Sequence, residues 1–249
     1  MTTSLPRASF ASLLVEMKKS EKSIGSATAF IVERDTKRYL VTNRHVVRGE
    51  QPNAMPLLPT DLTVMQHVAG QLGQWTPRTE ALYAGGEPRW YEHPVRPLDI
   101  DVAALPLLDD AGIDVYGYDP WATNRMLSAK LSEPLNIIGF PFGVTSGGAL
   151  GIWVRGFIAT DIALDWSNLP CFLVDSRTRS GQSGSPVIAY SPAGAATHVA
   201  SGGLAALADD VEEFFGVYSG RINAESDLGI VWKAHVVREI VEGKKRASL

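Results

Sequence analysis

This chain of 249 residues has only one cysteine, Cys171, so it cannot form an intramolecular disulfide. The same scarcity excludes a four-cysteine zinc site, and the five histidines form no H-E-x-x-H pattern. Walker A and G-x-G-x-x-G sequences are also missing, so we expect neither a metal nor a cofactor. A chain that cannot form disulfides is typical of a reducing compartment, and we therefore expect a cytoplasmic protein.

Long hydrophobic runs and an excess of positive charge are missing as well. The apolar run at residues 13–15 is short and Glu16 ends it, so we expect neither an export signal nor a membrane span. The net charge is −4, with 23 Lys and Arg against 27 Asp and Glu. Such a balance gives no attraction to nucleic-acid phosphates or anionic lipid. We therefore expect no nucleic acid and no membrane among the partners.

What the sequence does contain is many short apolar segments of strand length. They are rich in β-branched and aromatic residues, and Gly, Pro and Asn clusters separate them. This pattern predicts an all-β fold built from a sandwich or barrels. The segments are residues 28–32, 39–42, 62–68, 102–107, 135–138, 152–158, 172–174, 186–190 and 214–218.

Two segments depart from the strand pattern. Apolar residues recur at helical spacing near the end of the chain, which predicts a C-terminal helix over about 234–243, with Gly243 ending it. Residues 116–132 have a mixed character and separate two strand-rich halves, so we interpret them as a linker. The predicted domains are therefore 1–115 and 133–249.

The segment at residues 181–187 carries the strongest chemical signal. Its sequence, Gly-Gln-Ser-Gly-Ser-Pro-Val, predicts a tight turn that exposes the hydroxyl of Ser183 before an apolar strand. The N–H groups of Gly181 and Ser183 can then converge on one point. An oxyanion develops at such a point during acyl transfer, where each donor contributes ~3–4 kcal/mol. An ordinary Gly/Ser turn is the alternative interpretation.

Two other segments supply the side chains that a reactive serine needs. His45 follows an apolar strand, and imidazole is the side chain that accepts a proton near neutral pH. Asp101 opens a buried run, where its carboxylate can orient His45 and stabilise the imidazolium. The alternatives are a histidine that is merely packed or exposed and an aspartate that merely caps a strand. Asp99 also competes with Asp101 for this role.

The chain order of these residues separates families of serine hydrolases. The order His, Asp, Ser is that of the chymotrypsin-like proteases, whereas α/β-hydrolases run Ser, Asp, His and subtilisins run Asp, His, Ser. The sequence resembles a trypsin-like serine protease of the disulfide-free bacterial branch related to the HtrA proteases. The segments that carry the resemblance are residues 25–31, 42–47, 101–105, 138–143, 181–186, 216–221 and 229–232.

The resemblance covers about residues 25–243 and favours Asp101 over Asp99. It implies two six-stranded antiparallel β-barrels with the site in the cleft between them. The first barrel would carry His45 and Asp101, and the second would carry Ser183. His45 would then remove the Ser183 proton as the serine attacks a peptide carbonyl, and an acyl-enzyme would follow. The oxyanion hole would consist of the Gly181 and Ser183 N–H groups. A polypeptide substrate would contact Arg177, Ser219, Gly220 and Arg221.

Two arginines near the serine turn suggest which substrate side chain the enzyme prefers. Arg177 and the nearby Arg179 predict an acidic P1 side chain in the substrate, because guanidinium binds carboxylate with two hydrogen bonds. Arginines that are exposed or paired within the chain are the alternative.

Gln182 stands where trypsin-type zymogens have an aspartate, so we do not expect activation by N-terminal cleavage. Ser185 replaces the usual glycine, which we expect the turn to accept. Because the residues after Ser183 are needed to finish the second barrel, we expect no PDZ module.

Control of such a protease is a further question. Residues 143–151 and 191–213 are rich in Gly, Ala and Ser, and loops of this kind can change order when a partner binds. A regulatory protein partner, or gating by the substrate, is therefore a hypothesis.

Two other functions share the same fold: an inactive peptide-binding module and an esterase. The presence of all three triad residues argues against the first.

Overall fold

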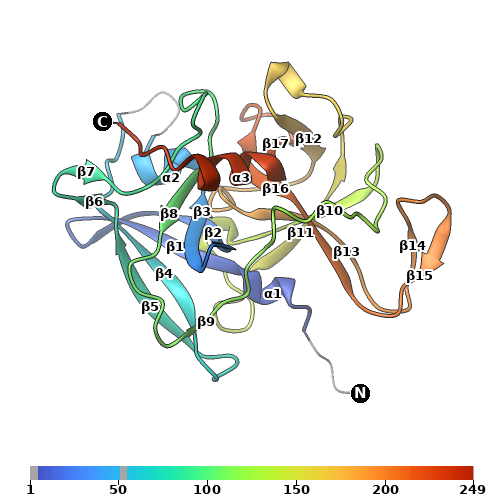
Figure 1. Cartoon of the computed structure of the whole chain (residues 1–249), viewed down its shortest axis with the longest axis horizontal. Helices are drawn as coiled ribbons and strands as arrows, with labels where there is room; N and C mark the ends of the chain where they lie inside the picture. The colour runs from blue at the N-terminus through green and yellow to red at the C-terminus, as the bar shows by residue number, and fades with distance from the viewer. Residues whose placement is uncertain (1–4, 51–54, 249) are drawn as a thin grey trace.

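Two antiparallel β-sheets lie side by side in the computed structural model of the chain, which describes residues 5–50 and 55–248 (Figure 1). The N-terminal sheet has seven strands in the order β5-β4-β1-β2-β3-β8, with β9 paired to β4. Strands β6 and β7 form a separate hairpin. The bounds are β1 Ser12–Lys19, β2 Lys22–Arg34, β3 Lys37–Thr42, β4 Asp61–Val68, β5 Trp75–Ala81, β6 Tyr83–Ala84, β7 Glu87–Pro88, β8 Ala103–Pro106 and β9 Ile113–Asp114.

The C-terminal half forms a closed six-stranded barrel in the order β10-β11-β12-β17-β16-β13. Pairing of β10 with β13 closes it. A two-stranded hairpin, β14–β15, extends away from the barrel (Figure 1). The bounds are β10 Pro134–Gly139, β11 Ile152–Ile158, β12 Cys171–Asp175, β13 Pro186–Ser191, β14 Ala196–His198, β15 Leu204–Ala206, β16 Val211–Arg221 and β17 Leu228–Lys233.

The predicted all-β class and the second barrel are confirmed, and the N-terminal half differs in detail. It has one strand more than the six that the resemblance implies, because β9 adds to the end of β4. Residues 61–64 of β4 pair with β1, whereas His67 and Val68 lie beyond the end of β1 and pair with β9. Among the described residues, no ladder joins β5 to β8, the two ends of the strand order.

All nine predicted apolar segments fall on strands, but the list of segments does not include eight others: the longer strands β1, β5 and β17 and the short strands β6, β7, β9, β14 and β15. In β1 the residues Glu16, Lys18 and Lys19 interrupt the apolar pattern, because only part of one face is buried. Strand β5 contains Pro77 and mostly polar residues. Each strand pairs with the strand next to it in the chain, β1 with β2 and β5 with β4, and β1 also pairs with the distant β4. Local composition does not reveal this backbone pairing.

The C-terminal helix α3 covers Ala234–Gly243, as predicted. The role of Gly243 differs from the prediction, because the left-handed residue that caps the helix is Lys244, with a φ of 47°. The N–H of Lys244 donates to Ile240 O at 3.0 Å. A Cβ on Gly243 would lie 2.9 Å from Pro94 Cγ, so the glycine is required by close packing.

The other helices are short. They are α1 Ala8–Ala11, α2 Arg44–Arg48, and the 3₁₀ turns Pro141–Gly143 and Trp166–Asn168. None of the helices in the described ranges is long and apolar enough to cross a membrane. Residues 115–133 contain no helix or strand, although Tyr118 N–H donates to Ile31 O at 3.0 Å. The domain limits stay a prediction, and their outer ends, residues 1 and 249, lie outside the described residues.

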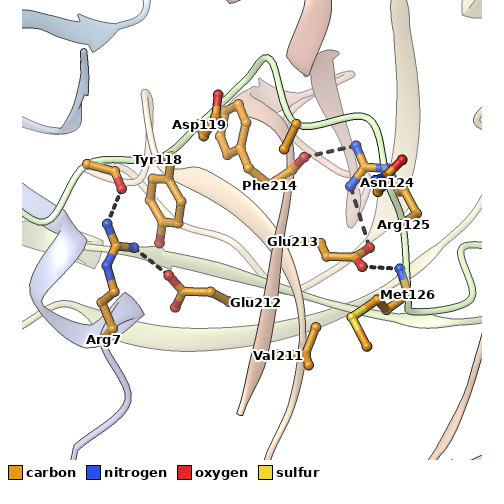
Figure 2. A pocket seen from close by; sticks show the side chains of 12 residues that line it. Arg7, Tyr118, Asp119, Asn124, Arg125, Met126, Val211, Glu212, Glu213 and Phe214 are labelled. Atoms are coloured by element: carbon orange, nitrogen blue, oxygen red, sulfur yellow. Dashed lines mark hydrogen bonds and ion pairs between the residues drawn. The ribbon is translucent and has the colours of Figure 1, made fainter. Parts of the chain in front are cut away.

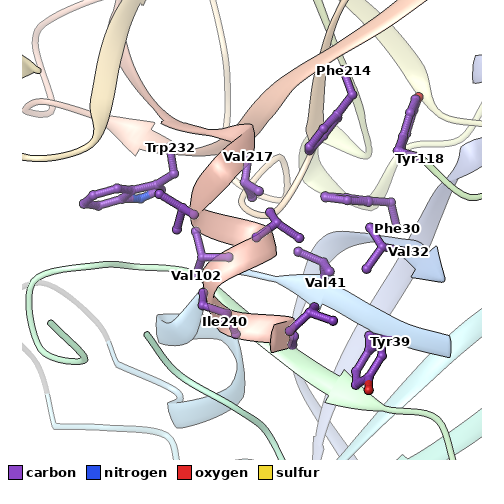
Figure 3. Packing of buried hydrophobic residues seen from close by; sticks show 14 of the residues in the cluster. Phe30, Val32, Tyr39, Val41, Val102, Tyr118, Phe214, Val217, Trp232 and Ile240 are labelled. Carbon is purple, nitrogen blue, oxygen red and sulfur yellow. The ribbon is translucent and has the colours of Figure 1, made fainter. Parts of the chain in front are cut away.

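The core between the two sheets is shared by both halves and by α3 (Figure 3). Phe30 and Val41 come from the N-terminal sheet, and Val217 and Trp232 come from the barrel. Ile240 of α3 packs in the same cluster and is fully buried. Burying each such side chain stabilises the fold by roughly 1.5–3 kcal/mol. This shared core fixes one sheet against the other, and so it sets the separation of residues that the two halves contribute to one site.

The start of β16 is attached to both the N-terminal segment and the linker (Figure 2). Arg7 forms an ion pair with Glu212. Arg125 of the linker donates to Phe214 O at 3.0 Å and lies 3.7 Å from the Glu213 carboxylate. A cavity of about 370 Å³ lies among these side chains. The contacts anchor one end of the strand whose other end reaches the site described below.

Candidate active site

His45 lies in the first turn of α2, directly after β3. Its Nδ1 lies 2.7 Å from Asp101 Oδ2, and its backbone N–H donates to Asp101 Oδ1 at 2.8 Å. The carboxylate of Asp101 therefore holds both the imidazole ring and the start of the helix. The competing residue, Asp99, is exposed and pairs with Arg96 at 3.1 Å. The structure thus brings His45 together with Asp101 and leaves Asp99 outside the site.

Two opposing effects act on the pKa of each partner in this pair. Burial lowers the pKa of His45, but the nearby Asp101 carboxylate outweighs burial and raises that pKa above its ordinary value. Burial raises the pKa of Asp101, but His45 and a hydrogen bond from Ser219 hold it below its ordinary value. Asp101 is therefore charged at neutral pH. Its charge favours the tautomer with the proton on Nδ1, which leaves Nε2 of His45 as a base.

Ser183 lies in the turn between β12 and β13, and Thr28 of β2 anchors that turn across the two halves. The N–H of Thr28 donates to Ser183 O at 2.9 Å, and its Oγ1 donates to Gly181 O at 2.9 Å. Gly184 is required here, because its φ is +85° and a Cβ would lie 2.1 Å from Thr28 O. Sequence reasoning missed Thr28, which has the signal of an ordinary strand residue.

The Ser183 hydroxyl donates to Ser219 O at 3.3 Å, and no hydrogen bond joins it to His45 in the described part of the chain. Ser183 and His45 nevertheless line the same cleft, of about 310 Å³, together with Met17, Ser26 and Ser180. A donor–acceptor distance of 3.3 Å marks a weak hydrogen bond, which a rotating hydroxyl readily exchanges. Catalytic hydrogen bonds are often long or unformed before substrate binds, so the absence of this bond does not exclude Ser183 as a partner of His45.

The N–H groups of Gly181 and Ser183 are held in place by the peptides around them. Phe142 N–H donates to Ser180 O at 2.6 Å, and because a peptide is planar, the Gly181 N–H points away from Phe142. Gly181 has a φ of +94°, and a Cβ there would lie 2.3 Å from Phe140 O. Neither N–H has an acceptor among the residues that the structure describes, so both are available to a ligand oxygen.

The two departures in the serine turn are both buried. Gln182 is fully buried, and its Oε1 accepts a hydrogen bond from Arg179 N–H at 2.7 Å. A neutral hydrogen bond within the turn therefore stands where a zymogen would have a charge. The Ser185 side chain lies against Gly139, which leaves the space that it occupies. A Cβ on Gly139 would lie 2.0 Å from Ser185 Oγ.

The residues predicted to bind substrate lie on two neighbouring segments, the start of the serine turn and the end of β16. Arg177 and Arg221 are exposed. Arg179 lies 4.0 Å from Asp227 and donates to Thr178 O at 2.7 Å, so it is paired within the chain. Ser219 and Gly220 are partly buried. The preference for an acidic P1 residue stays a prediction.

No group of three or more His, Cys, Asp or Glu side chains within residues 5–50 and 55–248 is placed to hold a metal ion. The site itself contains a charged carboxylate, an imidazole with a free nitrogen, and a hydroxyl near two N–H groups that have no acceptor among the described residues. Together these groups suit attack on a carbonyl carbon.

Comparison with known proteins agrees with the fold. The family model described as "Trypsin-like peptidase domain" matches residues 27–192. A serine endoprotease from Yersinia pestis has a similar solved structure, with 16% identity, a TM-score of 0.54, and coverage of 95% of this chain and 63% of that one. The active form of the Rv3671c protease from M. tuberculosis has 16% identity and a TM-score of 0.47, with coverage of 97% and 83%. Comparison with curated proteins finds no match.

Proposed function

Because the chain belongs to the family of trypsin-like peptidases, we propose that it is a serine endopeptidase whose catalytic triad is His45, Asp101 and Ser183. The observation that carries this proposal is the 2.7 Å contact of His45 Nδ1 with Asp101 Oδ2, in a cleft that also contains Ser183. The contact orients a basic nitrogen, and the shared cleft supports transfer of the Ser183 proton to that nitrogen. The polypeptide substrate and the roles of these residues are part of the proposal.

The first half of the reaction forms an acyl-enzyme. The Ser183 proton moves to His45 Nε2 while Ser183 Oγ bonds to the carbonyl carbon of the substrate. The carbonyl oxygen becomes an anion and accepts hydrogen bonds from the Gly181 and Ser183 N–H groups. His45 then gives its proton to the amide nitrogen, the C–N bond breaks, and the amine leaves. The positive charge that His45 carries between these steps is stabilised by Asp101.

The second half repeats the chemistry with water. His45 takes a proton from the water as its oxygen attacks the acyl carbon, and a second oxyanion forms in the same place. His45 then returns the proton to Ser183 Oγ as the acyl bond breaks and the acid product leaves. Both N–H groups are free of internal acceptors in the described residues, which supports their use in both halves.

Cleavage of an unfolded protein substrate tests this function. We expect fluorescently labelled casein to be hydrolysed by the wild type, and Ser183→Ala to abolish hydrolysis while leaving the circular dichroism spectrum unchanged. An esterase on the same fold would turn over a p-nitrophenyl ester but not casein. An inactive peptide-binding module would turn over neither substrate. Either of the last two results contradicts the endopeptidase proposal.

We also propose that a partner protein or the substrate itself controls access to the cleft. The neutral Gln182 offers no charged acceptor for a freed N-terminus, which supports control of another kind. Phe142 and Val144, 70% and 53% exposed, form an apolar edge beside the serine turn where a partner can bind. If the purified chain alone is fully active without any protein partner, and its rate shows no lag or activation as substrate is added, this part of the proposal is contradicted.

A further inference from the structure

Tyr218 lies directly behind the serine turn. It precedes Ser219 in β16, and its backbone bonds to the turn on both sides: Gly184 N–H donates to Tyr218 O at 2.9 Å, and Tyr218 N–H donates to Ser185 O at 2.9 Å. The side chain of Ser219 points to Asp101. Because successive side chains of a strand point to opposite faces, the Tyr218 side chain points the other way, into the barrel.

The ring of Tyr218 fills the space between the serine turn and β17. The side chain is 2% exposed, and its hydroxyl forms a hydrogen bond with Thr178 Oγ1. On the other side the ring lies against Gly229, where a Cβ would come within 2.4 Å of Tyr218 Cε2 and 3.0 Å of its hydroxyl oxygen. Thr178 is itself 1% exposed, so this hydrogen bond is closed to water.

This space is where the side chain before the scissile bond of a substrate would go. The substrate contacts that the family resemblance implies, Arg177 and residues 219–221, border this space, so a carbonyl group held by the Gly181 and Ser183 N–H groups would put that residue over the gap between residues 177–180 and the end of β16. The hydrogen bond of Tyr218 to Thr178 spans this gap. A long P1 side chain would therefore meet the Tyr218 ring.

We propose that Tyr218 closes the P1 pocket, so that the enzyme cleaves after small residues, namely Ala, Ser and Gly. This inference rests on the proposed endopeptidase function. It differs from the acidic P1 residue predicted from the arginines, because Arg177 is exposed and Arg179 is paired with Asp227. Tyr218 is a specificity-determining residue in this view.

The test uses peptidyl diphenyl phosphonates, which react with a catalytic serine and differ only in their P1 side chain. We expect the wild type to react with the Ala probe at least about tenfold faster than with the Phe, Leu or Glu probes, since a poorly fitting side chain typically costs such a factor or more. Removing the ring in Tyr218→Val should raise the rates for Phe and Leu at least about tenfold relative to Ala.

Two control variants separate the pocket from general effects. Tyr218→Phe keeps the ring and loses only the hydroxyl, so the order of the probes should not change. Phe215→Val truncates another buried aromatic side chain of the same strand and core cluster, and it should also keep the order. Equal rates for Ala, Phe and Glu in the wild type, or an unchanged order in folded Tyr218→Val, overturn the inference. If Tyr218→Val does not fold, the order of the wild-type rates with the Ala, Phe, Leu and Glu probes alone decides whether the inference stands.

A fluorophosphonate without a P1 side chain distinguishes failure of the pocket from failure of the function. If it does not label Ser183, the endopeptidase proposal fails, and the pocket proposal fails with it. If it labels Ser183 while the Ala probe reacts no faster than the large probes, only the inference about Tyr218 is overturned.

Discussion

Ser219 donates its hydroxyl to Asp101 Oδ2 at 2.5 Å, although the two residues come from different halves of the fold. The carbonyl of the same serine accepts the hydroxyl of Ser183 at 3.3 Å. One residue of β16 therefore contacts both the acid and the nucleophile of the proposed triad. Besides Thr28 of β2, β16 thus connects the two halves at the site, and Arg7 and Arg125 anchor its start.

Replacing this hydroxyl tests the connection. We expect Ser219→Ala to lower the free energy of unfolding by about 1.5–3 kcal/mol, since it removes a hydrogen bond to a charged group. Ser191→Ala is the control, because Ser191 is buried in the barrel and its Oγ has no hydrogen-bond partner among the described residues. Urea denaturation measures both variants. Equal stability of the two variants contradicts the assigned role of Ser219.

The pH dependence of the reaction follows from the raised pKa of His45. Activity requires neutral His45, so kcat/KM should rise with pH through a midpoint above the ordinary histidine value of about 6.5. The stabilisation of the fold that comes from the raised pKa of His45 is complete below the pKa of an unfolded histidine and is lost as pH rises through the pKa in the folded protein.

Asp101→Asn provides the comparison for this pH profile. The Asp101 charge is what raises the pKa of His45, whereas burial lowers it, so the variant should move the midpoint to lower pH. Titration of the His45 ring by NMR measures the same shift without turnover. A midpoint that stays in place in Asp101→Asn contradicts the pairing.

Gly184 should tolerate no side chain. Gly184→Ala is expected to destabilise the fold by more than about 2 kcal/mol and to remove activity, because a positive φ is combined with a Cβ 2.1 Å from Thr28 O. Gly194→Ala isolates the backbone effect, since its φ is +74° and nothing lies within 4 Å of its Cβ. Thermal unfolding of both variants separates steric contact from φ strain. Similar losses in the two would show that the contact with Thr28 is unimportant.

The Thr28 hydroxyl should affect stability and kcat, because it forms hydrogen bonds with two buried backbone groups near the serine turn. Its Oγ1 donates to Gly181 O and accepts from Phe140 N–H at 3.1 Å. Thr28→Val leaves both groups buried without a partner, so we expect a loss of about 1–3 kcal/mol in stability and a lower kcat. Thr63→Val is the control, because the buried Thr63 Oγ1 has no hydrogen-bond partner in the part of the chain that the structure describes. A kcat unchanged in Thr28→Val contradicts a role in holding the serine turn.

The sequence predicts those parts of the molecule that depend on local patterns. The apolar segments mark most strands, and the spacing of Val236, Val237, Ile240 and Val241 defines α3. His45, Asp101 and Ser183 each lie in a short recognisable motif, so their order in the chain separates the chymotrypsin-like proteases from other serine hydrolases.

The parts that the sequence does not predict depend on contacts between distant segments. Thr28 bonds to Gly181 across 153 positions, and Tyr218 bonds to Thr178 across 40. Neither Thr28 nor Tyr218 differs in its local pattern from other residues of a buried strand. Arg177 and Arg179 predict by their charge a pocket that binds an acidic P1 side chain, but the Arg179 side chain lies beside Asp227.

The most direct measurement is the mass of the protein after reaction with a fluorophosphonate, followed by mapping of the modified peptide. We predict one adduct, located on Ser183, with a rate that falls by orders of magnitude in His45→Ala and no adduct in Ser183→Ala. An adduct on another residue, or labelling that persists unchanged in Ser183→Ala, would contradict the assignment of Ser183 as the nucleophile of this protein.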